Sequence, residues 1–273
     1  MSKKMNNMIG LIGAGNMGSA LIAGIVEGKK FEVDQLVVSD IKGERAEYLA
    51  KKYHVRKADS NQTLIKDCGT IILAVKPKEI KPLLEDVKNE IRDDHLLITI
   101  AAGIPISTIR DTLQRDLSIV RVMPNTPAMV RMGITAISAG PGAKAKDIDM
   151  AVRIFSQVGE TVIVDEELMD AVTALSGSGP GYIFLIMEAL VDAGIELGLK
   201  EEIALSLAIQ TTLGTAQLAR ESKESLAELR DKVTSPGGTT SKGLAVMMKR
   251  GLTEIIIEAV EAACRRSKEL SSG

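Results

Sequence analysis

The feature that most constrains the fold is a short apolar run that ends in a glycine-rich turn. Residues 8–12 read Met-Ile-Gly-Leu-Ile, with the length and composition of a buried strand. The turn Gly13-Ala14-Gly15-Asn16-Met17-Gly18 follows, and apolar residues then recur at helical spacing. A strand, a Gly-x-Gly-x-x-Gly turn and a helix in this order are typical of a dinucleotide-binding unit.

Each glycine of this turn has a separate predicted task. Gly13 allows the tight turn, Gly15 lets a pyrophosphate approach the backbone, and Gly18 lets the helix pack closely on the strand. The helix N-terminus adds free N–H groups and partial positive charge. The competing interpretation is a tight turn with a structural role alone.

Apolar runs of strand length alternate with helical patterns through the first 164 residues. After the first strand they lie at 35–39, 70–75, 96–101, 118–123, 133–139 and 161–164, and a helix is expected over 143–158. This alternation predicts a parallel, doubly wound sheet of the Rossmann type. We therefore expect a dinucleotide-binding domain over residues 1–164.

Beyond Asp165 the strand pattern disappears. Helices are expected over 169–175, 182–197, 201–219, 226–232, 240–250 and 253–270, with a Gly-Ser break at 176–181. The 182–197 helix is apolar on nearly every side, and such a helix must be buried on every side. We therefore predict that residues 165–273 form an all-helical substrate-binding and dimerisation domain, and that the protein is an obligate dimer.

Ligands of a doubly wound sheet gather at the carboxyl ends of its strands. Asp40 ends the second strand, where an acidic residue usually meets the adenosine ribose, although it could equally be the N-cap of the 44–53 helix. A carboxylate there favours NAD, whereas Lys42 and Arg45 could hold a 2′-phosphate. Small residues at Ala74 and 101–103 suit a flat cofactor, or simply tight packing.

The helical half contains a second candidate binding site. Ser235-Pro236-Gly237-Gly238-Thr239-Thr240 opens a helix, with glycines that free the backbone and threonines able to cap it. A small carboxylate could dock there, although an ordinary capped turn has the same composition. Glu166 could face the same cleft or only favour its own helix dipole.

The Gly-Ser break lacks a general base. Residues 182–189 contain neither Lys nor His, one of which hydride transfer to or from an alcohol usually needs. An acceptor that arrives as a protonated imine needs positioning and a hydroxyl near its nitrogen, for which Thr240 is the candidate.

Composition excludes several other classes. The net charge of −2 offers no basic field for nucleic acid or anionic lipid, and three Tyr, three Phe and no Trp give few stacking platforms. Two distant cysteines and two histidines make disulfides, a metal site or a Ser-His-Asp triad improbable. No uncharged apolar stretch reaches about 18 residues. We expect a cytoplasmic protein with no membrane, nucleic-acid or metal partner.

Four motifs in order give the chain a family resemblance. Residues 12–18, 74–77 (Ala-Val-Lys-Pro), 175–180 (Leu-Ser-Gly-Ser-Gly-Pro) and 229–244 with Ser-Pro-Gly-Gly-Thr-Thr resemble Δ1-pyrroline-5-carboxylate reductases across essentially the whole chain. The resemblance implies NAD(P)H-dependent reduction of the cyclic imine to L-proline. It also implies a homodimer with interlocking helical domains, and such dimers often assemble further into decamers.

The resemblance also implies site residues. The cofactor, NADPH or NADH, would contact Gly13, Ala14, Gly15, Asn16, Met17, Gly18, Asp40, Asn61, Ala74, Val75, Lys76, Pro77 and Ala102. The substrate would contact Glu166, Ser235, Gly238, Thr239 and Thr240. Asp40 replaces the small hydroxyl residue often found in the family, so the usual NADPH preference stays open. Lys232 stands where some members have Asn and is left out of the site.

Two other functions fit parts of the sequence. A 3-hydroxyacid dehydrogenase has a similar glycine turn and two-domain layout, but it would need a catalytic Lys shortly after the Gly-Ser break, which this chain lacks. A cofactor-sensing module would bind the dinucleotide without turnover, but it would not need a second anion site. The reductase therefore explains more of the sequence than either alternative.

Overall fold

The computed structural model describes residues 8–272 and divides the chain into two compact units. Unit 1 runs to Ser178 and takes in the chain again from Ala263, whereas unit 2 is Gly179–Ala262. The predicted domain boundary at 164/165 lies where strands give way to helices, whereas the first unit ends at Ser178. The predicted boundary stays a prediction.

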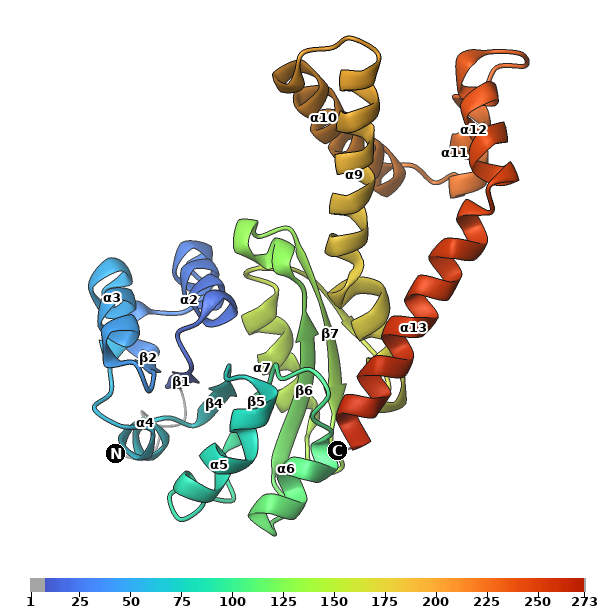
Figure 1. Cartoon of the computed structure of the whole chain (residues 1–273). Coiled ribbons are helices and arrows are strands. Elements are labelled where there is room, and N and C mark those ends of the chain that lie inside the picture. The colour runs from blue at the N-terminus through green and yellow to red at the C-terminus, as the bar shows by residue number, and fades with distance from the viewer. Residues whose placement is uncertain (1–7, 273) are drawn as a thin grey trace. The chain divides into compact units, whose positions relative to one another are not determined.

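Unit 1 is built on an eight-stranded sheet in the order β3-β2-β1-β4-β5-β6-β7-β8 (Figure 1). The strands are β1 (Ile9–Ile12), β2 (Leu36–Ser39), β3 (Arg56–Lys57), β4 (Thr70–Leu73), β5 (Leu96–Thr99), β6 (Ser118–Pro124), β7 (Gly133–Ala139) and β8 (Gly159–Ile163). The strand order reverses at the β1–β4 pair, which is where ligands bind in folds of this kind. The predicted α/β, Rossmann-type class is confirmed.

One pairing in this sheet runs against the prediction of a parallel sheet. β7 pairs with β6 in antiparallel orientation, Val120 opposite Ala139, while the other pairs are parallel. The connection between them holds only the short helix η2 (Thr126–Val130), and so short a link cannot make a parallel crossover. The sequence prediction also missed β3, which has only two residues.

Helices cover both faces of the sheet. They are α2 (Asn16–Gly28), η1 (Val33–Gln35), α3 (Gly43–Tyr53), α4 (Asn61–Asp67), α5 (Pro77–Val87), α6 (Ile106–Leu113) and α7 (Ala145–Phe155). Local signals set two of the starts: the Ser60 hydroxyl accepts the Thr63 N–H at 3.1 Å, and Pro77 occupies the first turn of α5.

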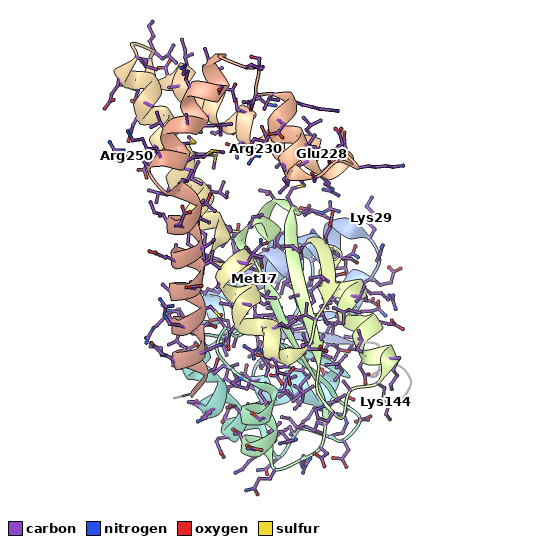
Figure 2. All side chains as sticks on the ribbon, turned by 90° about the vertical axis from the view of Figure 1, so that its right-hand side faces the viewer. Met17, Lys29, Lys144, Glu228, Arg230 and Arg250 are labelled. Atoms are coloured by element: carbon purple, nitrogen blue, oxygen red, sulfur yellow. The ribbon has the colours of Figure 1, made fainter. Side chains whose placement is uncertain are left out.

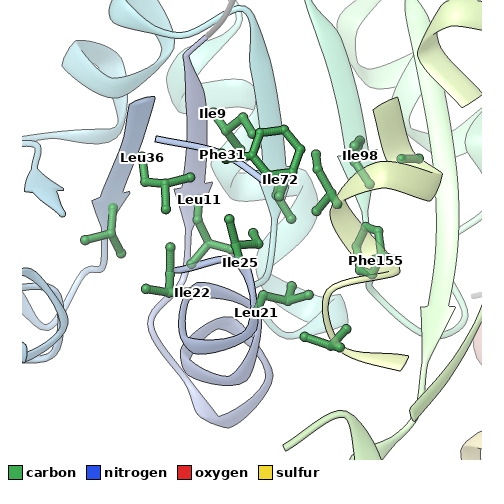
Figure 3. Packing of buried hydrophobic residues seen from close by; sticks show 14 of the residues in the cluster. Ile9, Leu11, Leu21, Ile22, Ile25, Phe31, Leu36, Ile72, Ile98 and Phe155 are labelled. Carbon is green, nitrogen blue, oxygen red and sulfur yellow. The ribbon is translucent and has the colours of Figure 1, made fainter. Parts of the chain in front are cut away.

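The apolar core lies in two clusters of buried side chains. In one, Ile22 and Ile25 of α2 pack near Leu11 and Leu36 of the sheet (Figure 3). The other joins β4 and β5 to α4, α5 and α6 and includes Cys68. Burial raises the pKa of the Cys68 thiol to about 12, so this sulfur stays protonated and unreactive.

His95, directly before β5, makes stability depend on pH. The residue is 1% exposed, its Nδ1 accepts the Arg92 N–H at 3.1 Å, and its Nε2 has no hydrogen-bond partner among residues 8–272. Burial, with the Arg92 charge, lowers its pKa to about 4. The unfolded chain titrates this group near 6.5, so below that pH it binds more protons than the folded chain.

We therefore expect stability to fall by about 2 kcal/mol between pH 7 and pH 5 through this residue. Urea unfolding at both pH values, on the wild type and on His95→Gln, measures the difference. Glutamine keeps an acceptor for the Arg92 N–H but does not titrate. The stability of His95→Gln should therefore fall by about 2 kcal/mol less than that of the wild type between the two pH values. Equal losses in the two proteins would contradict the assignment.

Unit 1 also contains the first helical turns after the sheet and the end of the last helix. After residues 164–165, η3 (Glu166–Leu168), α8 (Met169–Val172) and the π-helical turn η4 (Thr173–Gly177) follow one another directly. α13 (Leu252–Ser272) begins in unit 2 and ends in unit 1. Its C-terminal end bears the C mark in Figure 1.

Unit 2 consists of helices with little core of their own. They are α9 (Gly179–Glu196), α10 (Glu201–Glu221), α11 (Leu226–Lys232), α12 (Thr239–Lys249) and the first part of α13. No side chain of Gly179–Glu196 is buried in the described chain, and Phe184 and Leu185 are 64% and 65% exposed. The labelled Glu228 and Arg230 of α11 (Figure 2) bond residues nearby in sequence, Ser225 and Asp231 respectively.

Candidate functional site

The glycine turn after β1 has the geometry that the sequence predicts. Gly13 has φ 110°, and a Cβ there would collide with the Ala74 carbonyl. A Cβ on Gly18 would collide with the Gly13 carbonyl, so Gly18 serves the close approach of α2 to the turn. Gly15 is the N-cap of α2, and a Cβ on it would meet nothing within 4 Å in the described chain. Packing therefore explains Gly13 and Gly18 but not Gly15.

The turn opens onto a cleft of about 750 Å³ within unit 1. The cleft lies where β1, β4 and β5 end, next to the N-terminus of α2, where the labelled Met17 lies (Figure 2). Its lining includes nine residues predicted to hold the cofactor, namely Ala14, Gly15, Asn16, Met17, Ala74, Val75, Lys76, Pro77 and Ala102. Free N–H groups at the start of α2 and the charge of Lys76 are features that suit an anion.

Two further predicted residues support the turn rather than line the cleft. One carboxylate oxygen of Asp40 accepts the Ala14 N–H at 2.6 Å, and the other accepts the Lys42 N–H at 2.7 Å. Asn61 accepts the Ser39 hydroxyl at 2.8 Å through its side-chain oxygen. Asp40 is not the N-cap of α3, as one sequence interpretation had it, because that helix begins at Gly43 with Lys42 as its N-cap.

The cleft lining also includes residues that sequence reasoning did not assign to the site. They are Glu44 and Tyr48 of α3, Ser19 and Ile100, whereas Arg45 and Ala101, which also line the cleft, are candidates from the sequence. The spacing of 44, 45 and 48 puts the three on one helix face, which could have suggested a shared surface. Nothing local indicates that this face turns toward the cleft.

Glu166 is engaged in an ion pair inside unit 1. Its Oε1 accepts the Ile106 N–H at 2.7 Å and lies 3.3 Å from Nη1 of Arg121, a side chain that is almost fully buried in β6. This contact joins η3, β6 and the start of α6. These bonds indicate that Glu166 holds neighbouring elements of unit 1 together, in addition to any contact with substrate.

The second candidate binding site, residues 235–240, lies in unit 2 at the start of α12 and is called the α12 cradle below. Gly238 is the N-cap, its N–H donates to the Ser235 carbonyl at 3.0 Å, and Gly237 has φ 74°. The helix begins at Thr239, so the predicted capping by the threonines is wrong: a glycine fills that position. The backbone N–H groups of Thr239 and Thr240 belong to the first turn and have no intrahelical acceptor. Both residues are exposed.

The predicted Gly-Ser break between helices is also wrong. Residues 173–177 form a π-helical turn, and Gly179 already belongs to α9. A π turn inserts an extra residue without ending the helix, so small residues here mark a bulge. A Cβ on Gly177 would press on the Met123 methyl group, which explains one of these glycines by packing.

Two family models cover most of the chain. Residues 166–270 match the model described as pyrroline-5-carboxylate reductase dimerisation, and residues 8–103 match the model described as NADP oxidoreductase, coenzyme F420-dependent. The first of these includes the α12 cradle, and the second includes most of the cleft.

Full-length relatives agree with the models. The chain is 44% identical to a pyrroline-5-carboxylate reductase of Synechocystis over 97% of this chain and 99% of the relative. It resembles the solved structure of such an enzyme from Coxiella burnetii, with a TM-score of 0.92 and 37% identity over 98% and 99% of the two chains. It also resembles an NADP-bound structure of pyrroline carboxylate reductase from Plasmodium falciparum, with a TM-score of 0.88 and 32% identity over 98% of this chain and 99% of that chain. Since residues 8–103 match an NADP oxidoreductase model, residues 166–270 match the reductase dimerisation model and a relative of 44% identity matches over nearly the whole length, the chain belongs to the pyrroline-5-carboxylate reductase family of oxidoreductases.

Proposed function

We propose that the protein reduces 1-pyrroline-5-carboxylate to L-proline, the last step of proline biosynthesis, with NADPH or NADH. The observation that carries this is the cleft behind the glycine turn, in a chain that matches pyrroline-5-carboxylate reductases over nearly its whole length.

The cofactor would lie along the cleft, with its pyrophosphate at the start of α2. The backbone at Ala14, Asn16 and Met17 would bind the phosphates, and Gly15 would leave room for them. Asp40 would meet the adenosine ribose, while Asn61, Val75, Lys76 and Ala102 would complete the site. When bound, the reduced nicotinamide supplies a hydride to the imine carbon.

The substrate would lie at the start of α12. Backbone N–H groups of Thr239 and Thr240 are suited to its carboxylate, with Ser235 and Gly238 in the turn before them. The Thr240 hydroxyl would bond the imine nitrogen. Since the protonated imine already carries the proton that the amine product needs, these residues orient the substrate and no strong acid is required.

The test is a direct assay of NADH and NADPH oxidation with 1-pyrroline-5-carboxylate, with L-proline identified as the product. Proline formation with either cofactor supports the proposal. Binding of the cofactor without turnover would instead favour a sensor, and oxidation driven only by a hydroxyacid–ketoacid pair would favour the dehydrogenase.

Cofactor preference should depend on Asp40. Asp40 directly follows β2, and its carboxylate would repel a 2′-phosphate there and accept a ribose hydroxyl. Asp40→Ser should shift the ratio of kcat/KM values toward NADPH by about fivefold, corresponding to ~1 kcal/mol. Steady-state kinetics with both cofactors gives the ratio, and an unchanged ratio would remove Asp40 from selection. Because Asp40 also accepts the Ala14 N–H, the ratio is the informative quantity rather than either value alone.

The protein should be a homodimer or a larger assembly of dimers, such as a decamer, in the cytoplasm. The helical stretch Glu166–Glu196 is long and apolar enough to cross a membrane by length and composition; its 18-residue apolar window has a mean hydropathy of 1.3 and is 6% buried. It lies within the segment that matches the dimerisation family, so a second copy is the proposed cover. Light scattering after gel filtration without detergent should give at least twice the mass of 29.2 kDa. A monodisperse monomer, or a protein that needs detergent, would contradict this.

A further inference from the structure

The end of α13 packs on a loop of the cofactor cleft. The β5–α6 loop (residues 100–105) contributes Ile100, Ala101 and Ala102 to the cleft lining. The next residue, Gly103, is buried and has φ 70°. A Cβ placed on Gly103 would lie 3.1 Å from the Cβ of Leu270 and 3.4 Å from its carbonyl carbon. The last helix therefore lies directly behind the loop.

A buried hydrogen bond holds this end of α13 in place. Ser267, one turn before Leu270, is 4% exposed and donates its hydroxyl to Oδ1 of Asp170 at 2.6 Å. Ser271 donates to the same oxygen at 3.4 Å. A hydroxyl bonded to a carboxylate is among the stronger side-chain contacts, and this one is partly buried, so it ties α13 to α8 beside the loop.

The β5–α6 loop lies on the side of the cleft that would hold the nicotinamide half of a dinucleotide. Since the strand order reverses between β1 and β4, a bound dinucleotide would place its adenosine half on the side of β2 and its nicotinamide half on the side of β4 and β5. Ala101 and Ala102 lie on this second side. The Thr99 hydroxyl accepts the Ala101 N–H at 3.2 Å, and the residue after Ala102, Gly103, lies against Leu270.

We propose that Leu270, anchored through Ser267 and Asp170, is a positioning residue for the nicotinamide half of the cofactor. This rests on the proposed function. Leu270 belongs to the segment matched by the dimerisation family, so one helix serves both subunit association and the placement of the reacting ring.

Two substitutions at one position test the contact in the full chain. Leu270→Ala keeps the Cβ that faces Gly103, whereas Leu270→Gly removes it. We expect Leu270→Gly to raise the Kd for NADPH and to lower kcat, giving a loss in kcat/KM of about tenfold, with Leu270→Ala close to the wild type. ADP-ribose, which lacks the nicotinamide, should bind all three proteins equally.

Each other outcome counts against the proposal. Leu270→Gly with wild-type kinetics would overturn it, and an equal loss of ADP-ribose binding would show a general loss of structure instead. If Leu270→Gly does not fold, Ser267→Ala should give the same selective loss of NADPH binding. A double-mutant cycle tests the coupling. Gly103→Ala should weaken NADPH binding more in the wild type than in Leu270→Gly, where no Cβ at position 270 opposes the new methyl group.

These readouts separate the inference from the function on which it rests. A wild type that binds NADPH and makes proline, together with a silent Leu270→Gly, defeats only the positioning role. A wild type that makes no proline defeats the proposed function, while the comparison of NADPH with ADP-ribose still decides whether the end of α13 shapes the cleft.

Discussion

Gly15→Ala should raise the Kd for NADPH about 100-fold and cost at most about 1 kcal/mol of stability. The backbone at Gly15 is in an ordinary extended conformation, φ −74°, and a Cβ would meet no described atom within 4 Å. The fold therefore tolerates alanine there. The added methyl group would instead stand where the pyrophosphate approaches the turn. Fluorescence titration and thermal unfolding measure the two effects.

Gly13→Ala is the matched control in the same turn. At φ 110° alanine is strained, and its Cβ would collide with the Ala74 carbonyl, so this variant should lose stability as well as binding. The two glycines thus separate a ligand requirement from a folding requirement. Wild-type affinity in a well-folded Gly15→Ala protein would mean that the phosphates do not approach this turn.

Thr240→Ala should lower kcat/KM for 1-pyrroline-5-carboxylate tenfold or more and leave NADPH binding unchanged. The variant loses the hydroxyl proposed to bond the imine nitrogen, a contact of about 1.5–3 kcal/mol. Thr240 is exposed in the first turn of α12, so the substitution should leave the fold intact. Initial rates over a range of imine concentrations at saturating NADPH give the value.

Thr240→Ser and Ser241→Ala complete this experiment. Serine keeps the hydroxyl at position 240 and should retain most of the activity, whereas Ser241→Ala removes a neighbouring hydroxyl with no assigned role and should be silent. Full activity in Thr240→Ala would remove the residue from the mechanism, and equal losses at 240 and 241 would indicate a general effect on the helix start.

Much of unit 1 could be predicted because its elements carry local signals. Buried strands such as β4 read as continuous apolar runs, and Ser60 and Pro77 mark helix starts. The orientation of β7 could not be predicted from the alternation rule, since it follows from a connection too short for a crossover. The helical path through 173–181 was missed because glycine and serine indicate a break unless their packing is known.

The site was predictable only where it is contiguous in sequence. The glycine turn and the 74–77 stretch each follow a strand, so their place at the cleft follows from topology alone. The face of α3 that carries Arg45 and Tyr48 reaches the same cleft through the packing of another element. The bond from Ala14 to Asp40 likewise joins two strand ends and needs the sheet order to be known.

The lack of buried side chains in α9 has a thermodynamic consequence. A helix that finds no cover within its own chain gains its stabilisation when a partner arrives, so folding of this half and assembly become a single equilibrium. Dilution would then act as a denaturant. Mass action, rather than sequence alone, would decide how much of the enzyme is in working form.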